Sequence, residues 1–231
     1  TSQLVENAIG DEDIDKIEQI KESLVIYQPK AYITSCTEAG DLLSQWRAYA
    51  EDGSGYSIGF SPAAFKWNAD GVPYPSGSSD MIGLVKVIYE TNLQLQKITS
   101  LIDSFRDNGD IYDPGIVGGI LRQMSICFKN MAFSEEQEWR FIHSPYIVES
   151  EPDDPDLPPR FEIRGPLSPL LFRNTNRGLA AFFEFPFKPL HAIREVILGP
   201  KNKTNKETVL KLLRSNGFRS VKILRSKVPY R

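Results

Sequence analysis

Helix-like and strand-like segments follow one another irregularly along this chain, and this mixture constrains the fold more than any other feature of the sequence. Helical spacing of apolar residues predicts helices over residues 12–24, 40–50, 93–105, 120–131 and 204–216. Runs of β-branched and aromatic residues predict strands over residues 31–36, 56–60, 84–89, 136–148, 160–164, 180–187, 193–198 and 220–224. Because the two kinds of segment do not alternate in regular βαβ units, we predict an α+β fold of mixed, mainly antiparallel sheets with packed helices.

Proline, threonine and glycine mark the ends of several predicted helices. Pro114 lies in the middle of residues 109–119, which we interpret as a break between two helices. Thr204 is predicted to cap the last helix, with Glu207 three residues later completing a capping box. Gly217 suits the left-handed position that follows a helix, so we expect this helix to end at Asn216.

The composition is that of an ordinary globular protein. Hydrophobic residues make up 41% and charged residues 25% of the 231 residues, which predicts a single domain over residues 1–231 with a buried core. Two cysteines and two histidines are too few for a disulfide scaffold or a structural zinc site. We therefore expect reduced thiols in a cytoplasmic protein. No apolar run approaches the roughly 20 residues of a membrane span, so we expect no membrane partner.

Positive charge is concentrated at the end of the chain. Ten Lys and Arg residues stand between Lys201 and Arg231, against a single acid, Glu207. One interpretation is a basic helix–strand unit, residues 200–231 of the same domain, that attracts phosphate or nucleic acid. The other is a helix and a strand whose lysines are simply solvated.

Several catalytic signatures are absent from the sequence. It contains no P-loop, no Rossmann glycine fingerprint, no nucleophile elbow and no H-E-x-x-H motif. His143 and His191 each stand alone, without the neighbours that a Ser-His-Asp or Cys-His site needs. The sequence therefore disfavours acyl-transfer chemistry.

Two segments carry polar side chains suited to a functional site. The first is a strand that ends in small hydrogen-bonding residues, Thr34 to Thr37, followed by a helix with Asp41 in its first turn. One interpretation is that these hydroxyls orient a ligand or a catalytic carboxylate. The other makes Asp41 a charge at a helix end and Trp46 an anchor of the core.

The second segment is the predicted strand through Glu136, Glu138 and Arg140. Alternation along a strand places these side chains on one face, about 7 Å between successive Cα atoms, and Trp139 and Phe141 on the other. One interpretation is a site in which one carboxylate holds a substrate hydroxyl and the other acts as a base. The alternative is a solvent-facing surface with a weak Glu–Arg ion pair.

The order of several short motifs resembles the bacterial domain-of-unknown-function family 2971, over about residues 30–231. The motifs are Tyr32-x-x-Ser35-Cys36, Asp41-x-x-Ser44-x-Trp46-x-x-Tyr49, Gly55-x-x-x-Gly59-Phe60, Phe133…Glu136-x-Glu138-Trp139-Arg140, Glu195-Val-Ile-Leu-Gly-Pro200 and Ser226-x-x-Pro229-Tyr230-Arg231. Members of that family usually carry an upstream segment with a basic-or-His-Tyr strand and an Asn-Asp-Pro turn. The resemblance therefore implies that the N-terminal part of the family domain lies upstream of Thr1.

A second resemblance is to ADP-ribosyltransferases of the Arg-Ser-Glu type, whose site combines an Arg strand, a Ser-Thr-Ser strand and an E-x-E turn and strand. Here Thr34-Ser35 and Glu136-Gln137-Glu138 follow one another in that order. No Arg or His precedes Arg47, so the first motif is absent unless it lies upstream of Thr1. The resemblance implies an ADP-ribosyltransferase-like fold and an NAD-dependent transferase, acting as a bacterial toxin or phage-defence effector on a protein or nucleic-acid acceptor.

The same resemblance implies roles for individual residues. Glu138 would bind the ribose 2′-hydroxyl of NAD and stabilise an oxocarbenium-like transition state, Glu136 would orient or deprotonate the acceptor, and Ser35 would hold Glu138. Further contacts to the cofactor, including an aromatic ring stacked on nicotinamide, are expected from Thr34, Arg140, Tyr56 and Phe60. No metal is required by this mechanism.

Two other functions remain open from the sequence. One is a non-catalytic module that binds nucleic acid or a protein through the basic residues 200–231, with Glu138 and Arg140 as a structural pair. The other is nuclease or related phosphoryl-transfer chemistry, with Asp41, Glu136 and Glu138 on a metal ion.

Overall fold

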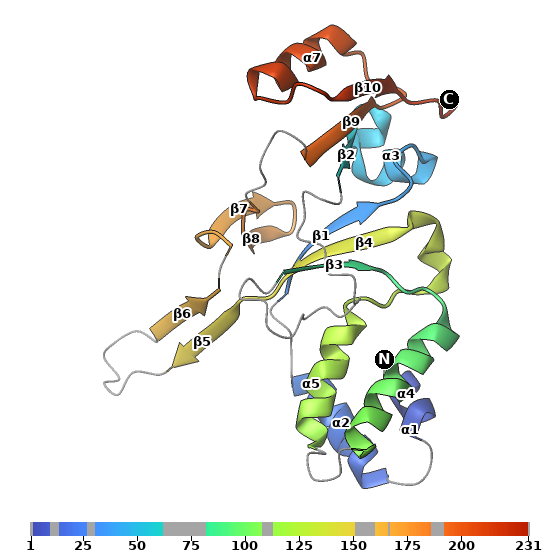
Figure 1. Cartoon of the computed structure of the whole chain (residues 1–231), viewed down its shortest axis with the longest axis vertical. Coiled ribbons are helices and arrows are strands. Elements are labelled where there is room, and N and C mark those ends of the chain that lie inside the picture. Colours follow the sequence, from blue (N-terminus) through green and yellow to red (C-terminus); the bar gives the residue numbers. More distant parts are fainter. Residues whose placement is uncertain are drawn as a thin grey trace. The chain divides into compact units, whose positions relative to one another are not determined.

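The computed structural model describes residues 2–9, 14–26, 31–61, 82–107, 113–150, 160–165, 167–185 and 192–230 (Figure 1). The chain divides into two compact units. Unit 1 comprises Thr1–Cys36 and Asp70–Phe183, and unit 2 comprises Thr37–Ala69 and Glu184–Arg231. Residues 200–231 therefore belong to unit 2, and the prediction of one domain over residues 1–231 stays a prediction.

Unit 1 combines helices with short sheets. Its described helices are α1 (Ser2–Ile9), α2 (Ile14–Ile26), α4 (Thr91–Asp107), α5 (Pro114–Ser125) and the 3-10 helix η4 (Met131–Glu136). Its strands are β1 (Tyr32–Thr37), β3 (Ile82–Lys86), β4 (Glu138–His143), β5 (Tyr146–Ser150), β6 (Arg160–Arg164), β7 (Leu171–Thr175) and β8 (Gly178–Phe182). They form a three-stranded sheet in the order β1-β4-β3 and the antiparallel hairpins β5–β6 and β7–β8. β4 is thus the central strand of its sheet.

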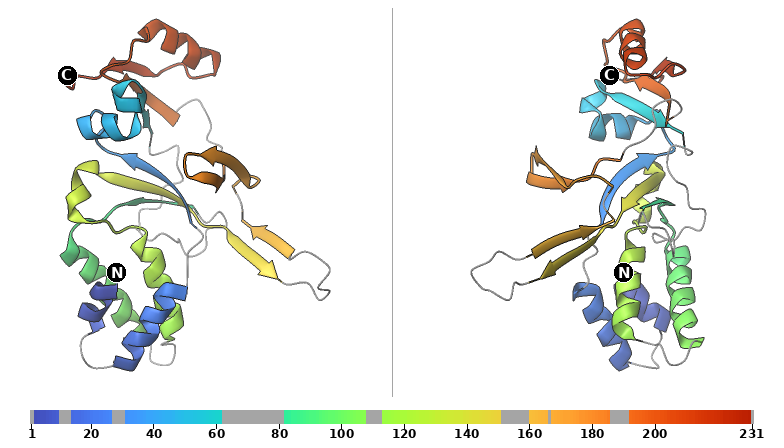
Figure 2. Two further views of the ribbon diagram at one scale, coloured as in Figure 1. Left: turned by 180° about the vertical axis from the view of Figure 1, so that it is seen from behind. Right: turned by 60° about the vertical axis from the view of Figure 1, so that its left-hand side comes forward.

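The helices α1, α2, α4 and α5 of unit 1 lie side by side in all three views (Figures 1 and 2). Residues of α2, α4 and α5 form one buried apolar cluster, made of Ile20, Leu24, Ile98, Ile102, Val117 and Leu121. A second cluster joins Val85 of β3 to Ile142 of β4 and Cys127. Phe128 packs against both clusters, so it connects the helices to the sheet that carries β4.

The predicted break over residues 109–119 does separate two helices, α4 and α5, but it extends too far, because α5 begins at Pro114. Asp113 caps the helix, and its carboxylate accepts hydrogen bonds from the backbone N–H of Gly115 at 2.7 Å and of Ile116 at 3.4 Å. Proline fits the first helical position because the N–H it lacks has no partner there, and its fixed φ suits a helix. The helix then ends at Ser125, earlier than the predicted Met131.

Gly118 shows why α5 tolerates several glycines. A Cβ atom at this position would lie 2.4 Å from the Cβ of Ser23 and 3.0 Å from the carbonyl oxygen of Ile20, both on α2. The absence of a side chain therefore allows α2 and α5 to approach closely.

The prediction that Glu136 lies on the strand is also wrong. Glu136 is the last residue of η4, which Asn130 caps by accepting a hydrogen bond from the N–H of Ala132. Gln137 then adopts the left-handed conformation, with φ 44° and ψ 49°, and β4 starts at Glu138. Because Gln137 interrupts the strand conformation, Glu136 does not belong to β4. Glu138 and Arg140 still lie on one face of that strand.

Unit 2 is built around a second three-stranded sheet, in the order β10-β9-β2. Its elements are α3 (Leu43–Tyr49), the 3-10 helix η1 (Glu51–Gly53), β2 (Tyr56–Phe60), β9 (Ile193–Leu198), α7 (Lys206–Ser215) and β10 (Lys222–Arg225). β2 runs antiparallel to β9, whereas β10 runs parallel to it. A parallel pair requires a crossover connection, and α7 supplies it, packing Val209 on Val196 and Leu198.

The cap of α7 differs from the predicted one. Asn205, not Thr204, precedes the helix and accepts a hydrogen bond from the N–H of Glu207 at 2.9 Å. Asparagine and threonine are both good caps, and here the Thr204 hydroxyl instead lies 2.8 Å from the hydroxyl of Tyr56.

The α+β class with mixed, mainly antiparallel sheets is confirmed. Strands β2, β6 and β9 have the predicted bounds, whereas β7 was not predicted at all. No helix within the described residues is both long and apolar enough to cross a bilayer. His191 and residues 186 and 187 of the predicted strand 180–187 lie outside the described residues.

Candidate functional site

Ser35 and Glu138 lie together on neighbouring strands of unit 1. Ser35 is on β1, Glu138 is the first residue of β4, and the serine Oγ donates a hydrogen bond to Glu138 Oε1 at 2.6 Å. The two residues are 103 positions apart in sequence, so only the pairing of β1 with β4 brings them into contact. This is the contact that the order of the two motifs implied.

Glu138 is buried and is surrounded by hydrogen-bond donors. Its side chain is only 5% exposed. Arg140, two residues along β4, donates from Nε to Oε1 at 2.9 Å and from Nη2 to Oε2 at 3.1 Å. Lys129 Nζ donates to Oε2 at 2.9 Å. A buried carboxylate requires this kind of compensation, because an unpaired charge away from water is very costly.

Glu136 reaches the site through Lys129 rather than through the strand. Lys129 Nζ lies 2.5 Å from Glu136 Oε2 and 2.9 Å from Glu138 Oε2, so one ammonium bridges both carboxylates. The sequence analysis did not predict Lys129. Charge balance could have indicated a second cation, because two carboxylates that converge need two positive charges and Arg140 supplies only one of them.

The backbone around Lys129 is fixed by contacts from α4 and from the segment after β3. Its N–H donates to the carbonyl of Ile88 at 3.1 Å, and its own carbonyl accepts from the side-chain amide of Gln94 at 3.0 Å. The same amide donates to the Ile88 carbonyl at 2.6 Å. Tyr89 adds a further tie, because its hydroxyl accepts a hydrogen bond from the backbone N–H of Glu138 at 2.9 Å.

The donors keep Glu138 ionised. Burial alone raises the pKa of its carboxyl group, but hydrogen bonds from Arg140, Ser35 and Lys129 outweigh burial and lower the pKa to about 2. Burial likewise lowers the pKa of Lys129, and hydrogen bonds to Glu136 and Glu138 reverse the effect and raise it. Glu138 therefore carries a fixed negative charge at neutral pH, which suits it to stabilise positive charge and not to donate a proton.

Arg140 and Thr34, both predicted to contact a cofactor, have different surroundings. Arg140 is engaged inside the protein, because it holds Glu138 with two nitrogens and donates from Nη1 to the carbonyl of Ile126. Thr34 is exposed and precedes Ser35 on β1, so the two side chains point to opposite faces of the strand.

Tyr56 and Phe60 lie on β2 in unit 2, and their stacking on nicotinamide stays a prediction. Tyr56 is 45% exposed, and its hydroxyl lies 2.8 Å from Thr204 Oγ1. Hydrogen bonds with Thr204 and Asn202 lower the pKa of Tyr56.

Asp41 forms a structural link within unit 2. Its Oδ1 accepts hydrogen bonds from Trp46 Nε1 at 2.7 Å and Ser226 Oγ at 2.6 Å, and its Oδ2 accepts from the N–H of Lys227 at 2.8 Å. Trp46 is 2% exposed, which confirms it as a core anchor. Among the residues that the structure describes, no group of three or more His, Cys, Asp or Glu side chains is arranged to hold a metal ion.

Neither the search of curated proteins nor the search of solved structures found a match. Residues 45–141 match the model of a family described as Protein of unknown function (DUF2971). The matched segment includes Lys129, Glu136, Glu138 and Arg140, and ends before β4 does. The resemblance to the domain-of-unknown-function family 2971 is therefore confirmed by this match over residues 45–141.

Proposed function

We propose that this chain is an NAD-dependent enzyme of ADP-ribosyltransferase type. The observation that carries the proposal is the hydrogen bond between Ser35 Oγ and Glu138 Oε1, with Glu136 joined to the pair by Lys129. A serine that fixes an ionised glutamate, with a second glutamate two residues earlier, is the arrangement that such a reaction uses. The biological setting that fits this activity is a bacterial toxin or phage-defence effector.

The reaction follows from the fixed charge of Glu138. As the bond between the ribose carbon and the nicotinamide nitrogen breaks, its electron pair leaves with nicotinamide and the ribose becomes cationic. Glu138 would accept a hydrogen bond from the 2′-hydroxyl and stabilise that cation electrostatically. A nucleophile of the protein or nucleic-acid acceptor would then bond to the ribose carbon, and Glu136 would take its proton.

The test is release of nicotinamide from NAD by the purified chain and by Glu138→Gln. Loss of one preorganised electrostatic group lowers such rates by about a hundredfold or more, so we expect that fall. Glu162→Gln is the matched control, because Glu162 also pairs with an arginine two residues along a strand, at 2.9 Å, but is exposed to solvent.

Circular dichroism would establish that both variants are folded, and Ser35→Ala would lower the rate without removing a charge. Unchanged NAD consumption in a folded Glu138→Gln chain would reject the proposed function.

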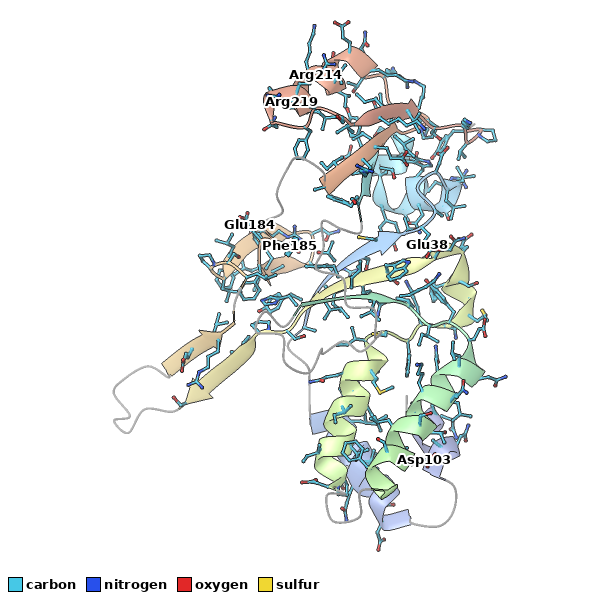
Figure 3. The ribbon with its side chains drawn as sticks, in the orientation of Figure 1. Glu38, Asp103, Glu184, Phe185, Arg214 and Arg219 are labelled. Carbon is cyan, nitrogen blue, oxygen red and sulfur yellow. The ribbon has the colours of Figure 1, made fainter. Side chains whose placement is uncertain are left out.

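A second candidate function is polyanion binding by unit 2. The exposed cations of the basic segment that form no ion pair with any described residue include Lys203, Lys206, Arg214, Arg219 and Lys222. Figure 3 labels Arg214, near the end of α7, and Arg219, which follows that helix. Unpaired surface cations are the groups that bind nucleic-acid phosphates.

Binding of a labelled oligonucleotide, measured at several salt concentrations, tests this second candidate. Each phosphate contact contributes a slope of roughly 0.7–0.9 to the fall of log affinity with log salt. The double variant Arg214→Gln/Arg219→Gln should therefore lower the slope by up to about 2. Absence of binding to DNA and RNA at low salt would reject it.

A further inference from the structure

The oxygens of Glu138 have no free position for a substrate hydroxyl. Oε1 accepts hydrogen bonds from Ser35 Oγ and Arg140 Nε, and Oε2 accepts from Lys129 Nζ and Arg140 Nη2. An ionised carboxylate offers about four lone-pair positions. A ligand hydroxyl can therefore bind Glu138 only when one of these donors leaves.

Lys129 is the donor best able to leave. Arg140 is held by two contacts with Glu138 and a third with the carbonyl of Ile126. Ser35 belongs to the strand adjacent to β4, and its hydrogen bond is the shortest at 2.6 Å. Lys129 has a flexible stem, is 21% exposed, and keeps a second partner, Glu136, at 2.5 Å.

We propose that Lys129 caps Glu138 in the ligand-free chain and that a hydroxyl of the ligand takes its place, while the ammonium stays on Glu136. The inference rests on the proposed function and adds to it the residue that sets the affinity of the site. The carboxylates of Glu136 and Glu138 remain balanced by Lys129 and Arg140 in both states, so the exchange transfers no charge out of the cluster.

The exchange predicts that removing Lys129 strengthens ligand binding. Lys129→Met keeps the length of the side chain but cannot donate, so the hydroxyl no longer competes with an ammonium. We expect NAD to bind about tenfold more tightly, which corresponds to about 1.4 kcal/mol. Lys129→Arg retains a cationic donor and should bind no more tightly than the unchanged chain. Lys97→Met, an exposed lysine of α4, controls for loss of a surface charge.

Ligands of different charge separate this exchange from a general electrostatic effect. NAD, ADP-ribose and the cation nicotinamide riboside share the ribose hydroxyls but differ in charge. Displacement of Lys129 predicts that Lys129→Met binds all three more tightly. Tighter binding of nicotinamide riboside with weaker binding of ADP-ribose would overturn the inference, because affinity would then follow charge alone.

Glu138→Gln distinguishes failure of this inference from failure of the proposed function. NAD binding and turnover that persist in Glu138→Gln would reject the proposed function whatever Lys129 does. Binding that depends on Glu138 but weakens in Lys129→Met would reject only the capping role. Isothermal titration calorimetry of the folded full chain measures NAD binding to each variant, and nicotinamide release measures turnover. Absence of NAD binding to every variant would reject both proposals.

Discussion

Because Glu138 stays ionised in the folded chain, we can predict how much of the free energy of unfolding it contributes at each pH. Its pKa falls from 4.5 to about 2 on folding, because three donors outweigh the effect of burial. At about 1.36 kcal/mol per pKa unit, this difference contributes about 3 kcal/mol to stability at neutral pH. A group whose pKa is lowered on folding stabilises the fold above its unfolded pKa. That contribution is lost as pH falls from about 5 toward 2.

The variant Glu138→Gln removes this titration. Between pH 7 and pH 3 the linkage relation assigns about 2 kcal/mol of the stability loss to Glu138. Urea unfolding at both pH values measures the free energy of unfolding of each chain. We expect the unchanged protein to lose about 2 kcal/mol more than Glu138→Gln over this range. Glu162→Gln should leave the pH dependence almost unchanged, because solvent screens its exposed pair with Arg164.

Parallel curves for the unchanged chain and Glu138→Gln between pH 5 and pH 3 would refute the reasoning. They would mean that the Glu138 pKa is the same in the folded and unfolded chains. The hydrogen bonds from Ser35, Lys129 and Arg140 would then provide no net preference for the ionised form.

Two further substitutions test packing and polar contacts. Gly118→Ala should lower the free energy of unfolding by about 1–3 kcal/mol, because the new Cβ would lie 2.4 Å from Ser23 Cβ. This cost outweighs the higher helix propensity of alanine. Thermal unfolding measures the change, and a stabilised variant would contradict the close approach of α2 and α5. Asp41→Ala should cost about 1–3 kcal/mol because the buried Trp46 indole N–H loses its acceptor. Increased exchange of that N–H in NMR would accompany the loss, whereas unchanged exchange and stability would contradict it.

Local signals were sufficient for elements whose ends are marked by turn residues. β9 stops before Gly199-Pro200, and β2 follows the turn at Gly53–Gly55, so the predicted bounds match. Pro114 misled the prediction because proline both breaks helices and begins them. The difference lies in the preceding residue: Asp113 is an N-cap, and an Asp-Pro pair at that place marks a start.

The site was only partly predictable because its residues meet through tertiary contacts. The order of motifs placed Ser35 and Glu138 together, but strand alternation gave the wrong reason for including Glu136. Its carboxylate comes from η4, after which Gln137 reverses the backbone. Nothing in the sequence next to Lys129 marks it, since its position depends on hydrogen bonds to Ile88 and from Gln94.

The free-energy cost of burying Glu138, Lys129 and Arg140 together indicates that this charged cluster serves a function beyond stability. Apolar side chains of similar size stabilise a buried site as well as an ion pair does, because they avoid the cost of removing charges from water. Stability alone therefore does not require an ionised Glu138 with Lys129 and Arg140 in unit 1. Chemistry that generates a cation does require such a group: an anion already fixed by Ser35 needs no reorganisation when positive charge appears. We infer that this use offsets the cost of burying Glu138. We also infer that Lys129 occupies Glu138 Oε2 until a ligand hydroxyl takes that position, while the ammonium stays on Glu136.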